Sequence, residues 1–272
     1  MTQLKSATVL ITGAAGGFGQ MLTRQLLAKG SQLILTDHPS ANLSSQLKTL
    51  EAEGDPKDDT GNVVACLDID LSDADGCEAL YNAIQQLNVA PDIVINNAGI
   101  ALVGTMVDLP PDRWETMLQV NLLTPMRLSR RFATDMMARG QGHIVNISSL
   151  AGWIAIPGLT AYAASKYGLR GFSEGLRHEL APHNVRVTTV YPFFSRTPLL
   201  KSPRFGKFSD SDRTLPPALT TDPSKIMAVT IRAIERNQTE IFPDKFALVG
   251  HWIKRYFPLV FRLFDRVKPG SI

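Results

Sequence analysis

The 272-residue sequence is poor in the residues that mark metal sites, disulfide bonds and membrane spans. It has two cysteines and five histidines, without a Cys-x-x-Cys pair or a histidine cluster at metal-ligand spacing. We therefore expect no metal and interpret Cys66 and Cys77 as core thiols. No run of about 18 uncharged apolar residues indicates a membrane span. A first strand expected near Ala7 leaves no room for a signal peptide, so we expect a cytoplasmic protein.

An excess of charge of one sign is also missing. The chain has 28 Lys and Arg residues against 25 Asp and Glu residues, a formal net charge of +3. This excess is too small to indicate nucleic-acid binding. Because 44% of the residues are hydrophobic, a chain of this length can bury one sizeable core, and we expect a single domain over residues 1–272.

Apolar runs alternate with segments of helical spacing along most of the chain. We expect strands at residues 7–12, 32–36, 63–68, 92–96, 143–147 and 186–191, and helices at residues 17–29, 43–53, 74–87, 112–137 and 161–180. Such alternation predicts an α/β fold, a doubly wound parallel sheet of the Rossmann-like type.

A glycine-rich turn joins the first predicted strand to the first predicted helix. It runs Thr12-Gly13-Ala14-Ala15-Gly16-Gly17-Phe18-Gly19. Glycines let the backbone turn sharply and approach a pyrophosphate at a helix N-terminus. Close packing of the helix on the strand is the alternative explanation for the same glycines.

Asp37 ends the second predicted strand, where a carboxylate can accept hydrogen bonds from the adenosine ribose and would repel a 2′-phosphate. Neither the glycine-rich turn nor the residues directly after Asp37 include Arg or Lys. Both observations favour NAD over NADP. Alternatively, Asp37 opens a turn with His38, Pro39 and Ser40.

Tyr162 and Lys166 are four residues apart in a predicted helix, so their side chains share one face. A neighbouring ammonium group lowers the pKa of a phenol from its ordinary value of about 10, so Tyr162 can exchange a proton with an alcohol. Ser149 follows the strand at 143–147, where its hydroxyl can bind a substrate oxygen, and Ser148 is its rival. Spacing alone leaves open that these are ordinary helix-surface and turn residues.

Together these motifs resemble the pattern of the short-chain dehydrogenase/reductase family. The resemblance extends from about Ala7 to Thr197. The residues that carry it are Thr12-Gly-x-x-x-Gly-x-Gly19, Asn96-Asn97-Ala98-Gly99, Asn121, Ser149 and Tyr162-x-x-x-Lys166. It implies an NAD(H)-dependent enzyme that interconverts a secondary alcohol and a ketone by hydride transfer. We also expect a homodimer or homotetramer.

The resemblance assigns roles to individual residues. It implies a catalytic tetrad of Asn121, Ser149, Tyr162 and Lys166, with Ser149 preferred to Ser148 because the family has its serine thirteen residues before the tyrosine. Tyr162 would be the acid/base, Lys166 would hold the nicotinamide ribose, and Asn121 would anchor a proton-relay water. Asp70 is preferred to Asp68 as the adenine-contacting acid. The expected cofactor-binding residues are Gly13, Gly17, Phe18, Gly19, Asp37, Asp70, Asn97, Ala98, Gly99, Tyr162, Lys166, Pro192 and Thr197.

One position departs from the family pattern. The family has Pro-Gly after the strand at 186–191, whereas this chain has Pro192-Phe193, and a positive φ at Phe193 would be costly. Aromatic residues follow in a predicted substrate lid at about 193–215, and Trp153, Ile154, Ile156 and Pro157 would extend an apolar wall. We therefore expect a lipid-like, steroid-like or aromatic substrate. Ordinary core packing or a subunit contact would also explain these apolar residues.

An amphipathic basic segment is expected at about 246–268. Three roles fit it: contact with an anionic membrane surface, an oligomer interface, or a cover over the cleft, of which the last two are favoured. Two other hypotheses for the whole chain remain, a non-catalytic NAD-binding regulator or scaffold and a membrane-surface protein acting through this segment. The intact Tyr162, Lys166, Ser149 and Asn121 argue against the regulator.

Overall fold

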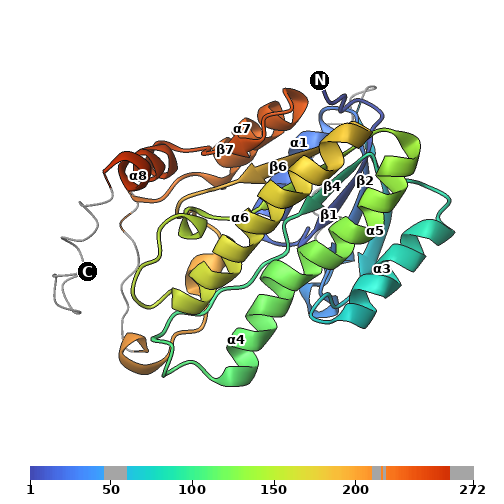
Figure 1. Ribbon diagram of the computed structural model, residues 1–272. Helices are drawn as coiled ribbons and strands as arrows, with labels where there is room; N and C mark the ends of the chain where they lie inside the picture. The colour runs from blue at the N-terminus through green and yellow to red at the C-terminus, as the bar shows by residue number, and fades with distance from the viewer. Residues whose placement is uncertain (46–59, 210–215, 217–218, 258–272) are drawn as a thin grey trace.

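The computed structural model describes residues 1–45, 60–209, 216 and 219–257. In these residues seven parallel strands form one sheet in the order β3-β2-β1-β4-β5-β6-β7. Figure 1 shows this sheet among the helices. Their bounds are β1 Thr8–Thr12, β2 Gln32–Asp37, β3 Asn62–Asp68, β4 Ile93–Asn96, β5 Gly142–Ile147, β6 Val185–Val190 and β7 Glu240–Ile241. The predicted fold class, a doubly wound parallel sheet in a single domain, is confirmed.

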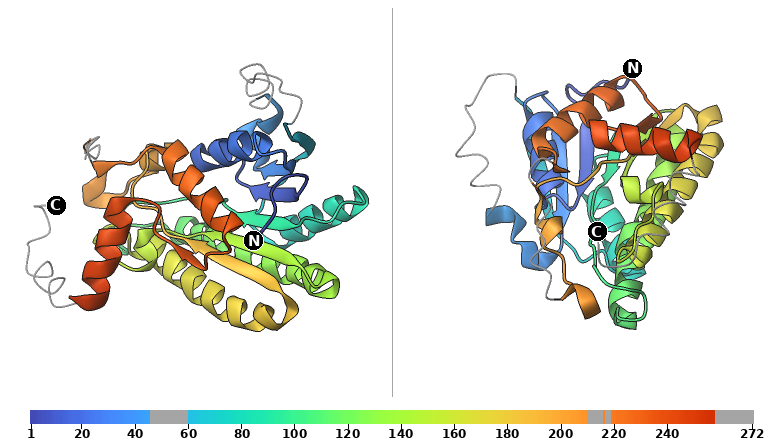
Figure 2. Two further views of the ribbon diagram at one scale, coloured as in Figure 1. Left: turned by 90° about the horizontal axis from the view of Figure 1, so that it is seen from above. Right: turned by 90° about the vertical axis from the view of Figure 1, so that its left-hand side faces the viewer.

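Helices cover both faces of the sheet (Figure 2). Helices α1 and α7 pack together on one face, while α3, α5 and α6 lie on the other. The bounds are α1 Gly17–Leu27, α3 Ala74–Gln86, α4 Pro111–Leu118, α5 Thr124–Arg139, α6 Thr160–Leu180, α7 Pro223–Glu235 and α8 Lys245–Tyr256. The strand order reverses between β1 and β4, and such a switch point is where open α/β sheets bind ligands beyond the carboxyl ends of their strands.

The alternation of side chains along β1 explains why both faces need cover. Val9 and Ile11 pack into the core cluster shared with α1 and α7, whereas Leu10 packs into the cluster shared with α3, α5 and α6. All five residues of β1 are buried. A strand that is apolar on both sides is stable only between two helical layers.

The predicted single helix at 112–137 is interrupted. Helix α4 ends at Leu118, a π-helical turn follows over Gln119–Leu123, and α5 then begins at Thr124. A π turn is rare and is often found at functional sites, because its wider backbone turns side chains out of helical register. Asn121 lies in the middle of this turn. The predicted helix at 43–53 lies outside the described residues beyond residue 45.

The interpretation of both cysteines as core thiols is half wrong. Cys77, on α3, is buried, but Cys66 is exposed. Cys66 belongs to β3, which is the edge strand of the sheet and has less cover than the central strands. In the described part of the chain, no helix has the length and apolar character needed to cross a membrane.

Candidate active site

The predicted catalytic side chains come together at the carboxyl ends of β4 and β5. Ser149 directly precedes the short 3-10 helix η3 (Leu150–Gly152), and its Oγ accepts a hydrogen bond from the Ala151 amide at 3.1 Å. Tyr162 and Lys166 both belong to α6, on its buried side. Asn121 is buried in the π turn between α4 and α5.

Lys166 occupies the centre of this group. Its Nζ donates to the carbonyl oxygen of Ile147 at 3.0 Å and lies 5.7 Å from the centre of the Tyr162 ring. Gly99 approaches the same group, since a Cβ atom there would lie 3.7 Å from Nζ and 3.3 Å from Oδ1 of Asn121. The residues after β4 and β5 therefore meet the buried side of α6 at one place.

Burial controls the protonation of the pair. Only 9% of Tyr162 and 4% of Lys166 are exposed. Burial raises the pKa of Tyr162 to about 12, although its hydrogen bond with Ser149 acts in the opposite direction. Burial also lowers the pKa of Lys166 to about 8. From the neighbouring ammonium group we expected the pKa of Tyr162 to lie below its ordinary value. It lies above that value, because desolvation of the phenolate outweighs the interactions that stabilise it.

The Asn121 side chain is fully engaged within the protein. Its Oδ1 accepts from the Ile100 amide and its Nδ2 donates to the Ile100 carbonyl, both at 2.9 Å. The second Nδ2 hydrogen is donated to Oγ of Ser165 at 3.1 Å. Because both donor hydrogens are used, this amide joins the loop after β4 to α6, and that is a positioning role.

The glycine-rich turn has the close backbone contacts that its sequence predicts. Gly13 has a φ of +65°, and a Cβ atom there would lie 2.7 Å from the Cα of Ala98. A Cβ atom at Gly19 would lie 2.2 Å from the Gly13 carbonyl oxygen. Any larger residue at these two positions would fill the cradle or push the turn away from the loop after β4.

The N-terminus of α1 is open for an anion. Gly16, which precedes the helix, makes no side-chain cap, and the first turn has no acidic residue. Free amide groups and the positive end of the helix dipole therefore point out of the glycine-rich turn. Gly17 and Phe18 begin this helix, and Phe18 is partly buried against the core beside α1.

Asn97 ties the two loops together. Its Nδ2 donates to the carbonyl oxygens of Thr12 and Gly13, at 3.0 and 2.9 Å. The backbone amides of Asn97 and Ala98 both donate to Oγ1 of Thr12, each at 3.0 Å. The loop from Asn97 to Gly99 is therefore fixed beside the glycine-rich turn.

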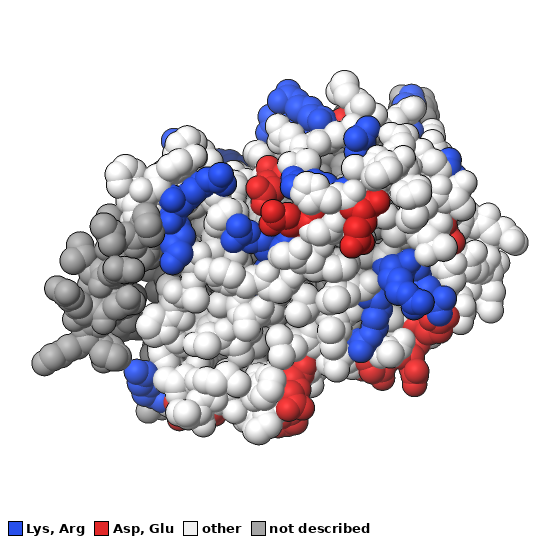
Figure 3. All heavy atoms as spheres, in the orientation of Figure 1, with Lys and Arg blue, Asp and Glu red and all other residues white. Residues whose placement is uncertain are grey.

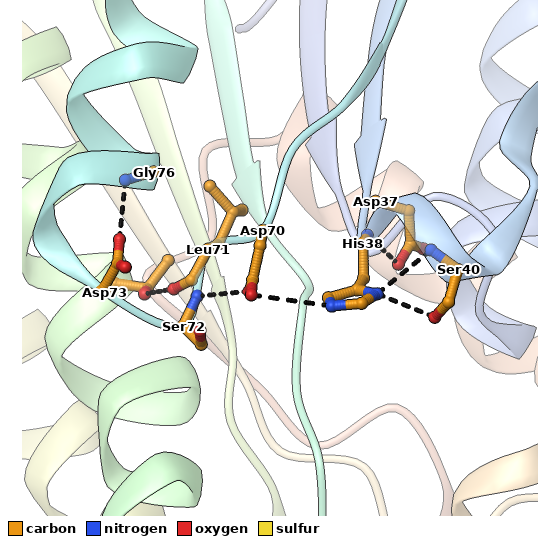
Figure 4. A network of polar contacts seen from close by, with 9 residues as sticks. Asp37, His38, Ser40, Asp70, Leu71, Ser72, Asp73 and Gly76 are labelled. Carbon is orange, nitrogen blue, oxygen red and sulfur yellow. Dashed lines mark hydrogen bonds and ion pairs between the residues drawn. The ribbon is translucent and has the colours of Figure 1, made fainter.

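Asp37, the last residue of β2, has its carboxylate at the same edge of the sheet (Figure 4). Oδ2 accepts from the Ala15 amide at 2.8 Å and Oδ1 from the His38 amide at 2.7 Å. His38 in turn extends towards Asp70, and its Nε2 lies 3.6 Å from Oδ2 of that residue. The two predicted acids are thus linked through His38. Asp68, the rival of Asp70, is instead the last residue of β3.

These residues fit a nicotinamide dinucleotide. The glycine cradle and the uncapped α1 suit a pyrophosphate, and the Asp37 carboxylate suits a ribose diol at the end of the neighbouring strand. Residues 7–205 of the sequence match the family model of the short chain dehydrogenases. The chain belongs to the short chain dehydrogenase family.

Relatives of this dehydrogenase are found among both sequences and structures. It is 37% identical to nodulation protein G of Rhizobium sp. (strain N33) over 194 residues, which are 71% of this chain and 75% of that protein. The chain spans between 45% and 77% of the length of the curated relatives it matches.

Two solved structures have the same fold. A short chain dehydrogenase/reductase from Burkholderia phymatum in complex with NAD matches over 100% of both chains, with a TM-score of 0.82 and 22% identity. A short-chain dehydrogenase from Sphingobium yanoikuyae in complex with NADPH matches over 98% of both chains, with a TM-score of 0.77 and 25% identity. A nicotinamide cofactor is therefore the cofactor type of this family.

The loop after β6 differs from the family pattern without strain in the dehydrogenase. Phe193 is not among the described residues with positive φ, and its amide donates to Oδ2 of Asp244 at 2.9 Å. The carbonyl oxygen of Pro192 accepts from the Leu150 amide at 2.9 Å, directly after Ser149. Thr197 lies against the glycine-rich turn, because a Cβ atom at Gly17 would be 2.8 Å from its Cγ2.

The predicted apolar wall is only partly present. Trp153 is buried and packs with Tyr191, Phe242 and His251, with its ring centre 4.2 Å from that of the histidine. It therefore belongs to the core beneath α8, the alternative weighed from the sequence. Ile156 is exposed. The predicted lid is described up to residue 209, while residues 210–215 and the stretch 258–268 of the predicted basic segment lie outside the described residues.

Three groups that help to build the site could not be identified from the sequence. The Ile147 carbonyl anchors Lys166, Ser165 joins Asn121 to the Tyr162 carbonyl, and Asp244 holds the loop after β6. The first is a backbone atom. The other two act through partners that are distant in sequence, so spacing within one motif could not identify them.

Proposed function

We propose that this dehydrogenase interconverts a hydrophobic secondary alcohol and its ketone with NAD(H). The observation that carries the proposal is the burial of the Tyr162 hydroxyl and the Lys166 ammonium group together beside Ser149, at the carboxyl ends of the central strands. A buried phenol next to a hydroxyl donor is suited to move one proton to or from a substrate oxygen.

A bound nicotinamide would supply or accept the hydride, and the protein would handle the proton. With a pKa of about 12, Tyr162 is protonated at neutral pH, so it donates its proton to the substrate oxygen during ketone reduction. Ser149 orients that oxygen by a hydrogen bond, and the charge of Lys166 stabilises the tyrosinate that forms. In alcohol oxidation the same groups act in reverse.

Asp37 supports NAD as the preferred cofactor. The two similar structures bind NAD in one case and NADPH in the other, so the preference must be argued from this chain. A 2′-phosphate beside Asp37 would meet a carboxylate that already accepts two backbone hydrogen bonds. The side chain after it is His38, which already contacts Asp70. This surrounding favours the ribose diol over a phosphate.

The surroundings of Tyr162 support an apolar substrate. Its ring belongs to a cluster that includes Leu102, Leu109 and Met117, and Trp114 and Phe205 pack against that cluster. The rings of Phe193 and Phe194 lie 4.8 Å apart in the loop that follows Pro192. A sugar would find few polar partners on such walls, whereas an aliphatic, steroid-like or aromatic chain would bury its surface.

We also propose that the enzyme is a homodimer or homotetramer. Met126 and Met137 on α5 and Tyr167 on α6 are exposed, and these helices lie on the outside of one face of the sheet. Apolar side chains on a helical surface of this kind are suited to a subunit contact. Light scattering measures the mass directly, and a monomer at assay concentration would contradict this part of the proposal.

Absorbance of the reduced nicotinamide tests the proposed reaction. The purified enzyme is presented with apolar secondary alcohols, and with ketones that include a steroid and a 3-oxoacyl thioester, each with the NAD and the NADP form of the cofactor. Turnover with an apolar compound and a preference for NAD are expected. Binding of NAD without turnover of any compound, in a protein whose Tyr162 is intact, would instead support the non-catalytic regulator.

A further inference from the structure

The outward side of α8 is an apolar surface. Val249, Trp252 and Tyr256 are each 55% exposed, and they share one side of the helix because they are three or four residues apart. Leu248 widens this side, and Phe257 extends it directly after the helix. We call Leu248, Val249, Trp252, Tyr256 and Phe257 the α8 apolar face. A soluble surface rarely gathers five large exposed apolar side chains within ten residues.

The opposite side of α8 already has its partners. Ala247 and His251 are buried, and the His251 ring stacks on Phe242 at 4.1 Å. A Cβ atom at Gly250 would lie 2.9 Å from a methyl carbon of Leu150, the residue after Ser149. The helix is thus fixed against the core by one side, and the α8 apolar face is not needed for folding contacts.

The charged side chains of α8 itself have one sign. Helix α8 contains Lys245, Lys254 and Arg255 and no acidic residue. Asp244, which precedes it, uses Oδ1 to cap the helix at the Ala247 amide and Oδ2 to accept from Phe193. In Figure 3 the surface over α8, at the upper left, is accordingly white and blue.

We propose that the α8 apolar face docks on an anionic lipid surface. An exposed helix with a strip of Trp, Tyr and aliphatic residues flanked by cations is suited to lie in the plane of a membrane interface. The aromatic rings of Trp252 and Tyr256, whose centres are 5.1 Å apart, would enter the headgroup region. Lys245 and Arg255 are exposed on the same helix and would meet the lipid phosphates.

Charge complementarity favours lipid over the other occupants. A symmetric contact between two copies through this face would place the cations of two α8 helices, with no acidic residue of α8, in one interface. The sequence from 258 to 272 is also basic, with Arg262, Arg266 and Lys268 against Asp265, so it is no better matched to the face. Anionic headgroups supply the missing negative charge.

Docking in this orientation would bring the active site to the membrane. The inner side of α8 contacts η3, the 3-10 helix that follows Ser149. Its outer side would rest on the lipid. An apolar alcohol dissolved in the bilayer would then reach the enzyme without crossing water. This consequence rests on the proposed function, whereas the docking itself does not.

Sedimentation with lipid vesicles tests the proposal on the full chain. The protein should bind vesicles of phosphatidylglycerol mixed with phosphatidylcholine, more weakly at high salt, and it should bind pure phosphatidylcholine vesicles much less. Lys245→Gln with Arg255→Gln should weaken binding about fivefold for each cation, about 25-fold together. Val249→Ser with Trp252→Ser should weaken it at least about tenfold, since the apolar contact is lost.

Matched controls separate this face from the rest of the surface. Val107, which is 93% exposed before α4, provides the apolar control Val107→Ser, and the exposed Arg236 after α7 provides the charge control Arg236→Gln. Both should bind vesicles like the unchanged protein. Circular dichroism of every variant confirms that the fold persists, because only surface side chains have been replaced.

Trp252 also reports its own position. Brominated lipid should quench its fluorescence, and the quenching should disappear in Trp252→Phe while binding persists. Equal binding to neutral and anionic vesicles, or loss of binding in the control variants, would overturn the proposal. So would a dimer that dissociates in Val249→Ser with Trp252→Ser without any vesicle binding, because the face would then be a contact between two copies. These outcomes are independent of whether any alcohol is oxidised.

Discussion

The ammonium nitrogen of Lys166 donates a hydrogen bond to the carbonyl oxygen of Ile147, the last residue of β5, at 3.0 Å. This bond joins the buried side of α6 to the end of a central strand. It holds the Lys166 ammonium group close to the Tyr162 ring, although burial of that charge costs free energy. The position of the proposed proton donor is therefore set by the sheet as well as by the helix.

Replacing Tyr162 by Phe should abolish most of the turnover. The ring and its packing remain, but the proton donor is lost, so we expect kcat to fall about a hundredfold to ten-thousandfold. NAD affinity, measured by titration, should change little. Tyr81→Phe is the control, because that hydroxyl bonds to Asp135 on α5, outside the site. Unchanged kcat in Tyr162→Phe would remove this residue from the mechanism.

Ketone reduction should depend on the charge of Lys166. Its pKa of about 8 means that the ammonium form, which stabilises the tyrosinate, is lost as the pH rises above about 8. We expect kcat/KM to be constant below this pH and to fall by up to tenfold for each pH unit above it. A profile that stays flat from pH 7 to about 10 would show that the Lys166 charge plays no part.

Asp37→Asn should narrow the preference for NAD over NADP. The amide keeps one oxygen for the Ala15 amide but no longer repels a phosphate, so we expect the ratio of the two kcat/KM values to fall about tenfold. Asp75→Asn, an exposed change in the first turn of α3, should leave the ratio as it is. An equal ratio in Asp37→Asn and the unchanged enzyme would contradict the role given to Asp37.

Two glycine-to-alanine changes should have different effects, one on stability and one on NAD binding. A Cβ atom at Gly171, within α6, meets nothing within 4 Å, so Gly171→Ala should raise the free energy of unfolding by about 0.5–1 kcal/mol. Gly19→Ala should instead distort the glycine-rich turn and weaken NAD binding, because its Cβ would overlap the Gly13 carbonyl. Urea denaturation and NAD titration measure the two effects. Tight NAD binding by Gly19→Ala would contradict the cradle.

The stability of the enzyme should fall in mild acid because of His143. This residue of β5 is buried between the hydroxyls of Thr2 and Thr188, at 2.9 and 2.8 Å, and burial lowers its pKa to about 3. The unfolded chain, with a histidine pKa of about 6.5, binds more protons than the folded one between these values. Its contribution is therefore complete above pH 6.5 and is lost as the pH falls towards 3.

Between pH 6.5 and 5 this loss should amount to about 2 kcal/mol in the free energy of unfolding. His143→Gln cannot titrate and should lack this part of the pH dependence, although it is less stable at neutral pH. Urea denaturation at several pH values makes the comparison. The same decline in both proteins would assign the effect to other groups.

The fold class and the site motifs could be predicted because they depend on local patterns. Spacing identified Tyr162, Lys166 and Ser149 as candidates, the resemblance to the family assigned their roles, and the structure brings them together. The π turn at Asn121 could not be predicted, because an apolar stripe continues on both sides of it and shows no break. The contacts that Asn121 makes in this turn, with Ile100 and Ser165, are with residues distant in sequence.

Burial of single residues was harder to predict than the fold. Cys66 was wrongly expected in the core, and the cleft and the core both remained open for Trp153, because the sequence does not reveal that β3 is an edge strand or that α8 covers Trp153. The raised pKa of Tyr162 was not predicted either, because it also depends on burial. The neighbouring charge could be read from the spacing, whereas the desolvation that outweighs it depends on residues from several elements.

The unequal exposure of the two cysteines makes chemical labelling of the enzyme simple. A thiol reagent at neutral pH should modify Cys66 and spare Cys77, whose thiol is buried and has a pKa raised by that burial. Strand β3 is at one edge of the sheet, and β7, which leads to α8, is at the other. A dye on Cys66 and a probe on α8 would thus lie beyond opposite edges of the sheet.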